Sequence, residues 1–388
     1  MESSIGTRVR QARTARGMSG EELARAIGTT KHTISKIETG ARRVEGGELA
    51  DLAHALNVSM RDLIGKREQV GPLALAGRLG GADHESPSAQ QAKQHVRHLL
   101  ELEGLLDELE IPRSTSSHTL TVRVPASANA TYEGEAAAEQ LRDALGMGDA
   151  PIAELSELLE QQGIDVTCVP LGDGNETISG LCVRSGYTRI ALVNSSKDTA
   201  HQRFTLAHEL AHLLFDDPTS EVHVDAAVGA QSKDAREVRA NAFASAFLLP
   251  IGALHRQVGT TKATEADFAQ LVFTMGVSVE ALANRVEKAG LADRQAIQAL
   301  RALTPKQLAL RHNRFGDWQQ RQQARHLRRP PTRLYERTLA AYTQARIGIG
   351  PLAGLLARSD EAALADELAD AGVAPQFEDD GVDVLQLL

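Results

Sequence analysis

The sequence predicts a multidomain, mainly α-helical protein that contains one small α+β domain between two helical regions. Its 388 residues leave room for two or three domains with hydrophobic cores of their own. Apolar residues recur at helical spacing over most of the chain, and strand-like runs are concentrated within residues 164–194. We therefore expect an all-α domain over 1–67, a linker and helix over 68–131, an α+β domain over 132–255 and a helical region over 256–388.

The N-terminal region differs in charge from the rest of the chain. Residues 1–67 carry 12 Lys or Arg against 8 Asp or Glu, although the whole chain has a net charge of −9. Five short helices are predicted here; Ser19 with Glu22 forms a capping box, and Gly28 separates the second helix from the third. The positive sign of this region alone suggests an anionic partner for it.

The segment from Gly28 to Gly40 resembles the second-helix signature of the phage-repressor type of helix-turn-helix, the XRE family. The resemblance spans most of residues 5–64 and implies that the third helix lies in the major groove of a double-stranded DNA operator. Ile34 and Ile37 are expected in the core, and the alternative is a small helical bundle without a ligand. The predicted DNA-binding residues are Thr30, Lys31, Thr33 and Ser35 for base edges, and Lys36, Arg42 and Arg43 for phosphates.

A possible dimer element follows. Gly71–Pro87 is rich in Gly and Ala and is interpreted as a linker. In the next helix a short heptad seam is formed by Ala92, His95, Leu99, Leu102, Leu106 and Leu109. Because relatives of the helix-turn-helix type usually bind inverted half-sites as dimers, this seam could join two copies into a homodimer; packing within the chain is the equal alternative.

The α+β domain is predicted from two helices, Glu135–Leu145 and Pro151–Gln162, followed by three short strands. The strands are expected over Ile164–Val169, Ile178–Arg184 and Tyr187–Asn194. We expect Arg189–Asn194 to be an edge strand that pairs with an extended peptide, and an interior strand is equally compatible with the sequence.

A helix then carries His208-Glu209-Leu210-Ala211-His212. Two histidines four residues apart lie on one face of a helix, as two ligands of one zinc ion require, and Glu209 lies beside them. The surrounding residues are mostly apolar, so the helix should be buried, and a metal would satisfy the buried polar groups. The pattern alone also occurs by chance on helix surfaces.

A hydrolytic zinc site needs a third protein ligand and an open position for water. The next predicted helix offers Glu237 as this ligand and Asn241, on the same face, as a residue that orients a ligand. A solvated surface acid is the alternative for Glu237, and His223 and Asp216 are the other candidate ligands.

The stretches from Arg203 to Leu214 and from Glu237 to Ala244, followed by Leu248-Leu249-Pro250, resemble the ImmA/IrrE family of zinc endopeptidases. The resemblance covers roughly residues 133–291 and implies a zincin-like fold with His208, His212 and Glu237 as metal ligands. It also implies that Glu209 acts on water and that the substrate is a repressor or antitoxin protein. Many relatives have Gly where this chain has Ala211 and His where it has Asp216.

The C-terminal region contains three segments with distinct sequence features. Residues 266–290 resemble a second helix-turn-helix, for which we favour a structural role. Residues 301–337 contain 10 Lys or Arg against 2 acids, and residues 359–388 contain 9 acids and no Lys or Arg. The simplest interpretation is that the acidic tail lies against the basic segment.

Composition restricts the remaining function classes. No apolar stretch is long enough to span a membrane, no signal peptide is recognisable, and a DNA-binding chain is expected in the reducing cytoplasm, where Cys168 and Cys182 would be free thiols. The predicted cofactor is Zn²⁺, although Mn²⁺ or Fe²⁺ also accept two imidazoles and a carboxylate.

Three functions are compatible with these features. The first is a DNA-binding transcription regulator that is also a zinc-dependent endopeptidase, active on a repressor or antitoxin under stress or DNA damage. The second is a non-catalytic regulator whose zincin domain senses a metal or peptide, and the presence of Glu209 favours the first over it. The third is a repressor that cleaves itself within the linker.

Overall fold

The structure is a computed structural model that describes residues 5–16, 18–44, 46–56, 63, 86–113, 122, 127, 129–172, 174, 177–185, 188–215, 234–259 and 262–376. The chain divides into two compact units. Unit 1 consists of Met1–Pro72, Arg97–Thr115 and Thr332–Leu388, and unit 2 of Leu73–Val96 and Ser116–Pro331. The predicted linker at 71–87 and the predicted fifth helix of the N-terminal domain lie almost wholly outside the described residues.

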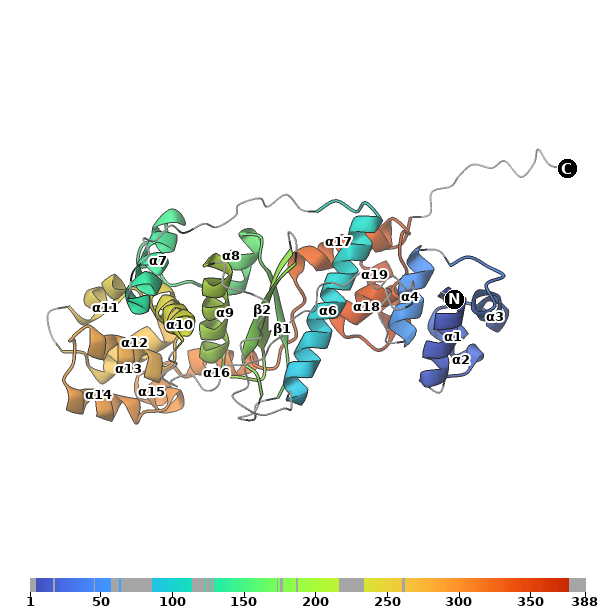
Figure 1. Cartoon of the computed structure of the whole chain (residues 1–388). Coiled ribbons are helices and arrows are strands. Elements are labelled where there is room, and N and C mark those ends of the chain that lie inside the picture. The colour runs from blue at the N-terminus through green and yellow to red at the C-terminus, as the bar shows by residue number, and fades with distance from the viewer. Residues whose placement is uncertain are drawn as a thin grey trace. The chain divides into compact units, whose positions relative to one another are not determined.

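The predicted mainly α-helical class, with one small sheet, is confirmed (Figure 1). The N-terminal helices are α1 (Ile5–Ala15), α2 (Gly20–Ala26), α3 (Lys31–Glu38) and α4 (Gly46–Leu56). The middle of the chain forms α6 (Pro87–Glu108), α7 (Ala130–Ala144), α8 (Leu155–Gln161), β1 (Asp165–Val169), β2 (Gly180–Ser185), β3 (Thr188–Asn194), α9 (Thr199–Leu214) and α10 (Ala235–Leu248). The remaining helices are α11 (Ile251–Val258), α12 (Glu265–Met275), α13 (Val279–Lys288), α14 (Arg294–Arg301), α15 (Pro305–Arg311), α16 (Phe315–Gln323), α17 (Thr332–Thr343), α18 (Gly350–Leu356) and α19 (Glu361–Asp370).

In unit 1, the four N-terminal helices close around a small apolar core. Ile34 and Ile37 on α3 are both buried in it, as predicted. The predicted capping box opens α2: the Ser19 hydroxyl accepts from the Glu22 amide, and the Glu22 carboxylate accepts from the Ser19 amide. These two hydrogen bonds satisfy backbone amides at the start of α2 and fix where the helix begins.

In unit 2, the three strands have the spatial order β1-β3-β2. β3 pairs in parallel with β1 and antiparallel with β2, so it is the central strand. The expectation that Arg189–Asn194 is an edge strand is therefore wrong. Six of the seven residues of β3 are buried, which is typical of a strand covered on both faces.

The helix of the predicted dimer seam is α6. Its seam residues Ala92, Leu99, Leu102 and Leu106 are buried within a single chain. His95 instead contacts the Thr167 hydroxyl through Nε2, at 3.1 Å. Packing within the chain thus accounts for the seam, and the homodimer stays a prediction.

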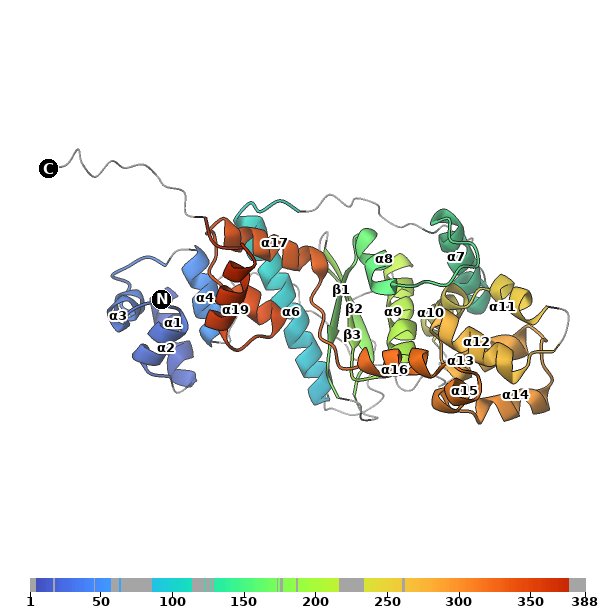
Figure 2. The same cartoon turned by 180° about the vertical axis from the view of Figure 1, so that it is seen from behind.

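The C-terminal helices contribute to both units. Phe268, Val272 and Leu282 of α12 and α13 belong to the same hydrophobic core as the sheet and α9, in agreement with a structural role for this pair. In Figures 1 and 2 the chain after α16 runs beside β1, where Arg329 forms a bridge with Cys168. α17, α18 and α19 belong to unit 1.

The basic segment does not use the acidic tail as its partner in the part of the chain that the structure describes. Arg311 pairs with Glu265, Arg329 with Glu160, and Arg337 with Glu103 and Asp107. In the described part of the tail, Glu361 contacts His54 and Glu367 contacts Arg358. None of these described ion pairs joins the acidic tail to the basic segment, contrary to the expectation.

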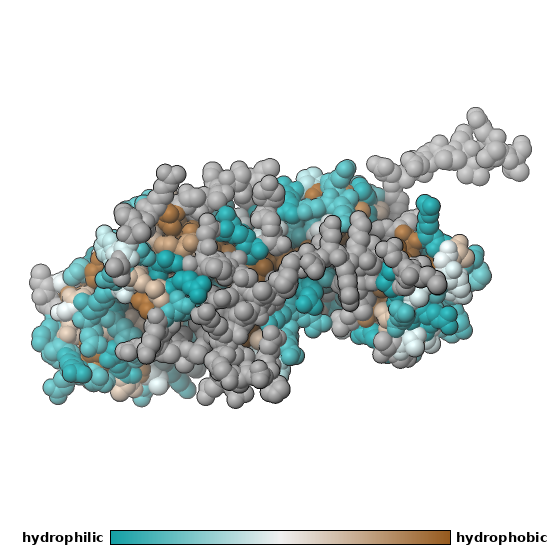
Figure 3. Space-filling model, viewed as in Figure 1, coloured by the Kyte–Doolittle hydropathy of each residue, from teal (hydrophilic) through white to brown (hydrophobic). Residues whose placement is uncertain are grey.

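The structure also describes part of the surface and both cysteines. Hydrophilic residues predominate over the coloured part of the face shown in Figure 3, with hydrophobic ones scattered among them. No described helix is long and apolar enough by itself to cross a membrane, and only α12 and α13 together, bent by 117°, reach that length and composition. Cys168 and Cys182 are free thiols, and burial raises the pKa of Cys168 to about 11.

Candidate metal centre

Helix α9 places three polar side chains in the interior of unit 2. It begins after Asp198, whose carboxylate accepts from the Ala200 amide, and its apolar residues pack against β2 and β3. His208, Glu209 and His212 are each at most 1% exposed. Groups buried this deeply need partners, because an unpaired polar group in an apolar interior costs several kcal/mol, about 2 to 7.

Helix α10 provides the other half of the site. The carboxylate of Asp234 caps its start, and Glu237 follows in the first turn. α7 comes close to α10 at Gly134, where a Cβ atom would lie 2.8 Å from the Phe243 amide nitrogen. Glu237 and Asn241 lie on the side of α10 that contacts α9, and they meet His208 there.

Three possible ligands converge. His208, His212 and Glu237 each offer a donor atom, and these atoms all lie within 4.8 Å of one another. The two Nε2 atoms are 3.0 Å apart, and Glu237 carboxylate oxygens lie 3.4 Å from His208 Nε2 and 3.6 Å from His212 Nε2. Ligands bound tetrahedrally at about 2.0–2.1 Å are roughly 3.3 Å apart, so these residues fit a zinc ion.

Asn241 determines which nitrogen of His208 can face this group. Its amide oxygen lies 3.0 Å from His208 Nδ1. When Nδ1–H donates to that oxygen, the lone pair of Nε2 is directed to His212 and Glu237, which is the tautomer a metal ligand needs. The position matches the orienting role predicted for Asn241.

Glu209 is held in a separate place beside the three ligands. Its Oε2 atom is buried and has no hydrogen-bond partner among the described residues. Gly180, the first residue of β2, lies against it: a Cβ atom there would be 3.6 Å from Glu209 Oε1 and 2.7 Å from the Leu192 carbonyl oxygen. The sequence analysis missed Gly180, for which the only signal was a glycine at the start of a strand.

Among the other residues considered from the sequence, the structure describes Arg203 of α9 but not two of the candidate ligands. The guanidinium of Arg203 donates to the carbonyl oxygens of Ala153 and Ile152, at 3.1 and 2.6 Å. Asp216 and His223 lie outside the described residues. Glu237 is therefore the described carboxylate that meets both histidines.

The predicted DNA-binding residues are gathered on and beside α3. Lys31, Ser35, Lys36, Arg42 and Arg43 are exposed. Thr30 is the N-cap of α3, because its hydroxyl accepts from the Thr33 amide at 3.2 Å, and Arg42 contacts Glu48 at 2.7 Å. The side chains available at the surface of this helix are thus mainly basic or hydroxylic, as a DNA-binding helix requires.

Both regions match families of known proteins. Residues 159–287 match a peptidase family described as the IrrE N-terminal-like domain, and residues 4–64 match a family described as a helix-turn-helix domain. The first match contains the two histidines, Glu209 and Glu237, and the second contains α1–α4.

Individual relatives agree with this division. The radiation response metalloprotease IrrE of Deinococcus radiodurans is 30% identical over 148 residues, which are 37% of this chain and 38% of that protein. An uncharacterized transcriptional regulator in the ATPase CF(0) region of Rhodospirillum rubrum is 43% identical over 58 residues, 15% of this chain and 54% of that protein. The chain thus spans between about a third and a half of the length of these relatives.

One solved structure can be aligned over most of the chain, although the alignment is poor. ComR from S. thermophilus, in complex with DNA and its signalling peptide ComS, covers 95% of this chain and 94% of its own at 12% identity, with a TM-score of 0.23. A score this low carries no argument about the arrangement of this chain. The two family matches show that the chain combines an N-terminal helix-turn-helix domain with a domain similar to the IrrE N-terminal-like domain.

Proposed function

We propose that this protein is a DNA-binding transcription regulator whose IrrE-like domain is a zinc-dependent endopeptidase that cleaves a repressor or antitoxin protein. The observation that carries the enzymatic part is the convergence of His208, His212 and Glu237 within 4.8 Å. The DNA-binding part is supported by the helix-turn-helix match and by the exposed basic residues of the α3 region.

The chemistry proposed for the site depends on a metal and on Glu209. A zinc ion held by the three ligands would act as a Lewis acid and lower the pKa of water in the site. Glu209 would accept a proton from this water at Oε2 and pass it to the leaving amine. Its burial next to Gly180, without a described hydrogen-bond partner, supports this role because a structural carboxylate would be expected to be paired.

The sheet order suggests where a peptide substrate would bind. β2 pairs with β3 on one side and begins at Gly180, beside Glu209. An extended peptide can add to an edge strand through main-chain hydrogen bonds. We therefore assign the substrate edge to Gly180–Ser185 in place of the central strand that the sequence analysis favoured.

A comparison of new protein N-termini tests this function. Host cells would express the wild type or Glu209→Gln, with and without DNA damage. A positioned general base contributes about 10²- to 10⁴-fold to a rate, so we expect fragments that form with the wild type to fall by at least about 100-fold with Glu209→Gln. Zinc content, measured on both purified proteins, should be equal.

A matched control and the opposite outcome make the result interpretable. Glu139→Gln changes an exposed carboxylate on α7 and should leave every fragment in place. If zinc is bound and no fragment depends on Glu209, the domain acts as a sensor and the peptidase proposal fails. If the fragment derives from this chain itself, the substrate is the regulator and not a separate repressor.

A further inference from the structure

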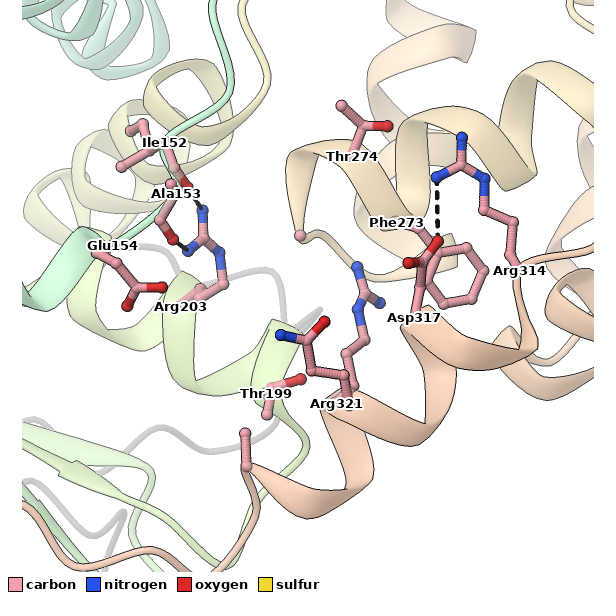
Figure 4. A pocket seen from close by; sticks show the side chains of 13 residues that line it. Ile152, Ala153, Glu154, Thr199, Arg203, Phe273, Thr274, Arg314, Asp317 and Arg321 are labelled. Carbon is pink, nitrogen blue, oxygen red and sulfur yellow. Dashed lines mark hydrogen bonds and ion pairs between the residues drawn. The ribbon is translucent and has the colours of Figure 1, made fainter.

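A second feature of unit 2 lies at the start of α9, in a cavity of about 330 Å³ (Figure 4). The loop before α8, the first turn of α9, the end of α12 and one face of α16 line it. Its charged lining residues are three arginines and two acids: Arg203, Arg314, Arg321, Glu154 and Asp317. None of the candidate metal ligands belongs to this lining, so the cavity is distinct from the metal centre.

Arg203 and Arg321 are the two lining arginines without a direct ion pair among the described residues, although Glu154 lies near Arg203, and Asp198 and Asp317 lie near Arg321. Arg314 pairs with Asp317 at 3.0 Å, whereas neither Arg203 nor Arg321 forms an ion pair with any described carboxylate. Arg203 donates to main-chain carbonyl oxygens, and Arg321 donates to the Val272 carbonyl and lies over the Phe273 ring. Figure 4 shows Arg321 extending toward the middle of the cavity, with Arg203 on one side and Arg314 on the other.

The two guanidinium groups affect each other electrostatically. Burial, and then the like charge of Arg321, lower the pKa of Arg203 to about 10, and burial also lowers the pKa of Arg321. Both remain charged near neutral pH. Two like charges in a partly dry cavity repel each other, and an anion placed between them would reduce this repulsion.

Two polar atoms in this lining lack a hydrogen-bond partner among the described residues. Arg203 Nε and Thr199 Oγ1 are buried and have no hydrogen-bond partner among the described residues. Gly276 makes room for Arg203, because a Cβ atom at this glycine would lie 2.6 Å from Nε. Asp198 already caps α9, so the arginines, rather than the helix end, provide the positive charge.

A neighbouring cavity of about 420 Å³ shares Glu154, Thr199 and Arg203 with the first. Its remaining lining combines apolar residues, among them Leu155, Val193, Leu206 and Leu327, with the charged residues Glu157, Arg328 and Arg329. Pockets for small molecules commonly measure about 300–1,000 Å³ and combine apolar walls with a few polar groups. An arginine pair beside such walls fits a molecule with an anionic head and an apolar body.

We propose that these adjoining cavities bind a small organic oxyanion, a carboxylate or a phosphate ester, with its charged group between Arg203 and Arg321. Guanidinium groups bind both anions through charge-assisted hydrogen bonds. The ligand contacts Thr199 and Arg203 in the first turns of α9, the helix that carries His208 and His212 further along. A bound metabolite of this kind would thus contact the same helix that carries the candidate metal ligands.

Calorimetric titration of the full chain in chloride buffer tests this site with three probes: inorganic phosphate, octanoate and octyl phosphate. We expect one site for at least one probe. Gln320→Glu adds a carboxylate to the cavity lining at an exposed position, and Arg321→Met removes one charge while keeping an apolar contact with Phe273. Each should weaken binding at least about tenfold.

Matched variants separate this site from general surface charge. Gln323→Glu is on the same helix and exposed, and Arg325→Met removes a charge from the same segment; neither residue lines either cavity. Both should change the dissociation constant less than about threefold. If Arg321→Met fails to fold by circular dichroism, Gln320→Glu decides.

The outcomes identify the ligand class or overturn the site. Binding of both phosphates but not octanoate indicates a phosphate ester, and binding of octanoate or octyl phosphate without inorganic phosphate indicates that the apolar body is required. Absence of binding by all three probes, or wild-type affinity in Gln320→Glu, overturns the proposal. Because no metal ligand is altered, this result is independent of whether the protein cleaves a substrate.

Discussion

The candidate metal centre of unit 2 and a cluster in unit 1 contain the same types of side chain and hold them in different ways. In unit 1, Asp51 and His54 on α4, His98 on α6 and Glu361 on α19 lie together, with His54 Nε2 3.3 Å from a Glu361 carboxylate oxygen. Among the described residues, only the group on α9 and α10 brings three donor atoms within 4.8 Å of one another.

The difference comes from what surrounds each group. His208 is oriented by Asn241, and its partner His212 is one turn away on the same helix. In unit 1, by contrast, the backbone of α18 packs directly against the cluster: a Cβ atom at Gly354 would lie 2.9 Å from the His54 ring. We therefore expect that proximity of His and carboxylate groups alone does not make a metal site, and that a shared direction of their lone pairs is also required.

The largest expected effect separates the two clusters by metal content. His208→Gln should lower bound zinc from about one per chain to none, because a tetrahedral site loses one of three protein ligands. His54→Gln removes the same type of side chain from unit 1 and should leave the zinc content unchanged. Metal analysis after dialysis measures both, and loss of zinc from His54→Gln would contradict the distinction.

The orienting contact provides the next test. Asn241→Leu should weaken zinc binding about 10- to 100-fold, the usual effect of removing a group that holds a ligand from behind. Asn241→Asp keeps an oxygen acceptor for His208 Nδ1–H and should retain tight binding. Competition with a zinc chelator gives the affinities, and equal affinity for Asn241→Leu and the wild type would leave the Asn241 contact without a role.

The smallest expected effect is a pH dependence of the free energy of unfolding that comes from Asp51 in unit 1. Burial, and then the charge of Glu361, raise the pKa of Asp51 from 3.8 to about 7, so the folded state binds this proton more tightly than the unfolded chain. The stability due to Asp51 is complete below about pH 4, and is lost as the pH rises to about 7. The loss should be on the order of 2 kcal/mol, after allowing for solvent screening.

Neighbouring groups make a variant necessary for this measurement. Burial, and then the charge of His54, lower the pKa of His98, which acts in the opposite direction because stability falls as the pH drops through its unfolded value. Urea unfolding at pH 5 and pH 8 should show that Asp51→Asn removes the destabilisation at the higher pH relative to the wild type. An identical pH dependence in both proteins would mean that Asp51 is not protonated in the folded state.

Local sequence signals were sufficient where the structure depends on neighbours in the chain. The capping box at Ser19 and the i, i+4 spacing of His208 and His212 are of this kind, and both appear in the structure. The meeting of Glu237 with the histidines was suggested by the family resemblance as much as by spacing, because it depends on how α10 packs against α9.

Features that depend on long-range pairing could not be obtained in this way. Strand order is one of them. β3 follows β2 in the chain, but it lies between β1 and β2 in the sheet and pairs in parallel with β1. The arginine cavity is another, because Arg203 on α9 and Arg321 on α16 are more than a hundred residues apart in the chain and line one cavity only in the folded protein. The acids that pair with the basic segment are a third example. We expected them in the C-terminal tail, and the described ion pairs instead use Glu265, Glu160 and Glu103.

The bridge between Cys168 and Arg329 has a practical consequence for anyone preparing the IrrE-like domain alone. The Cys168 amide donates to the Arg329 carbonyl at 2.9 Å, and the Arg329 amide donates back at 3.0 Å, so the chain beyond α16 covers the outer edge of β1. A fragment ended at residue 287, where the family match ends, would leave that edge exposed. Open strand edges recruit other strands, so such a fragment should aggregate, whereas one that continues through Pro331 keeps its own cover.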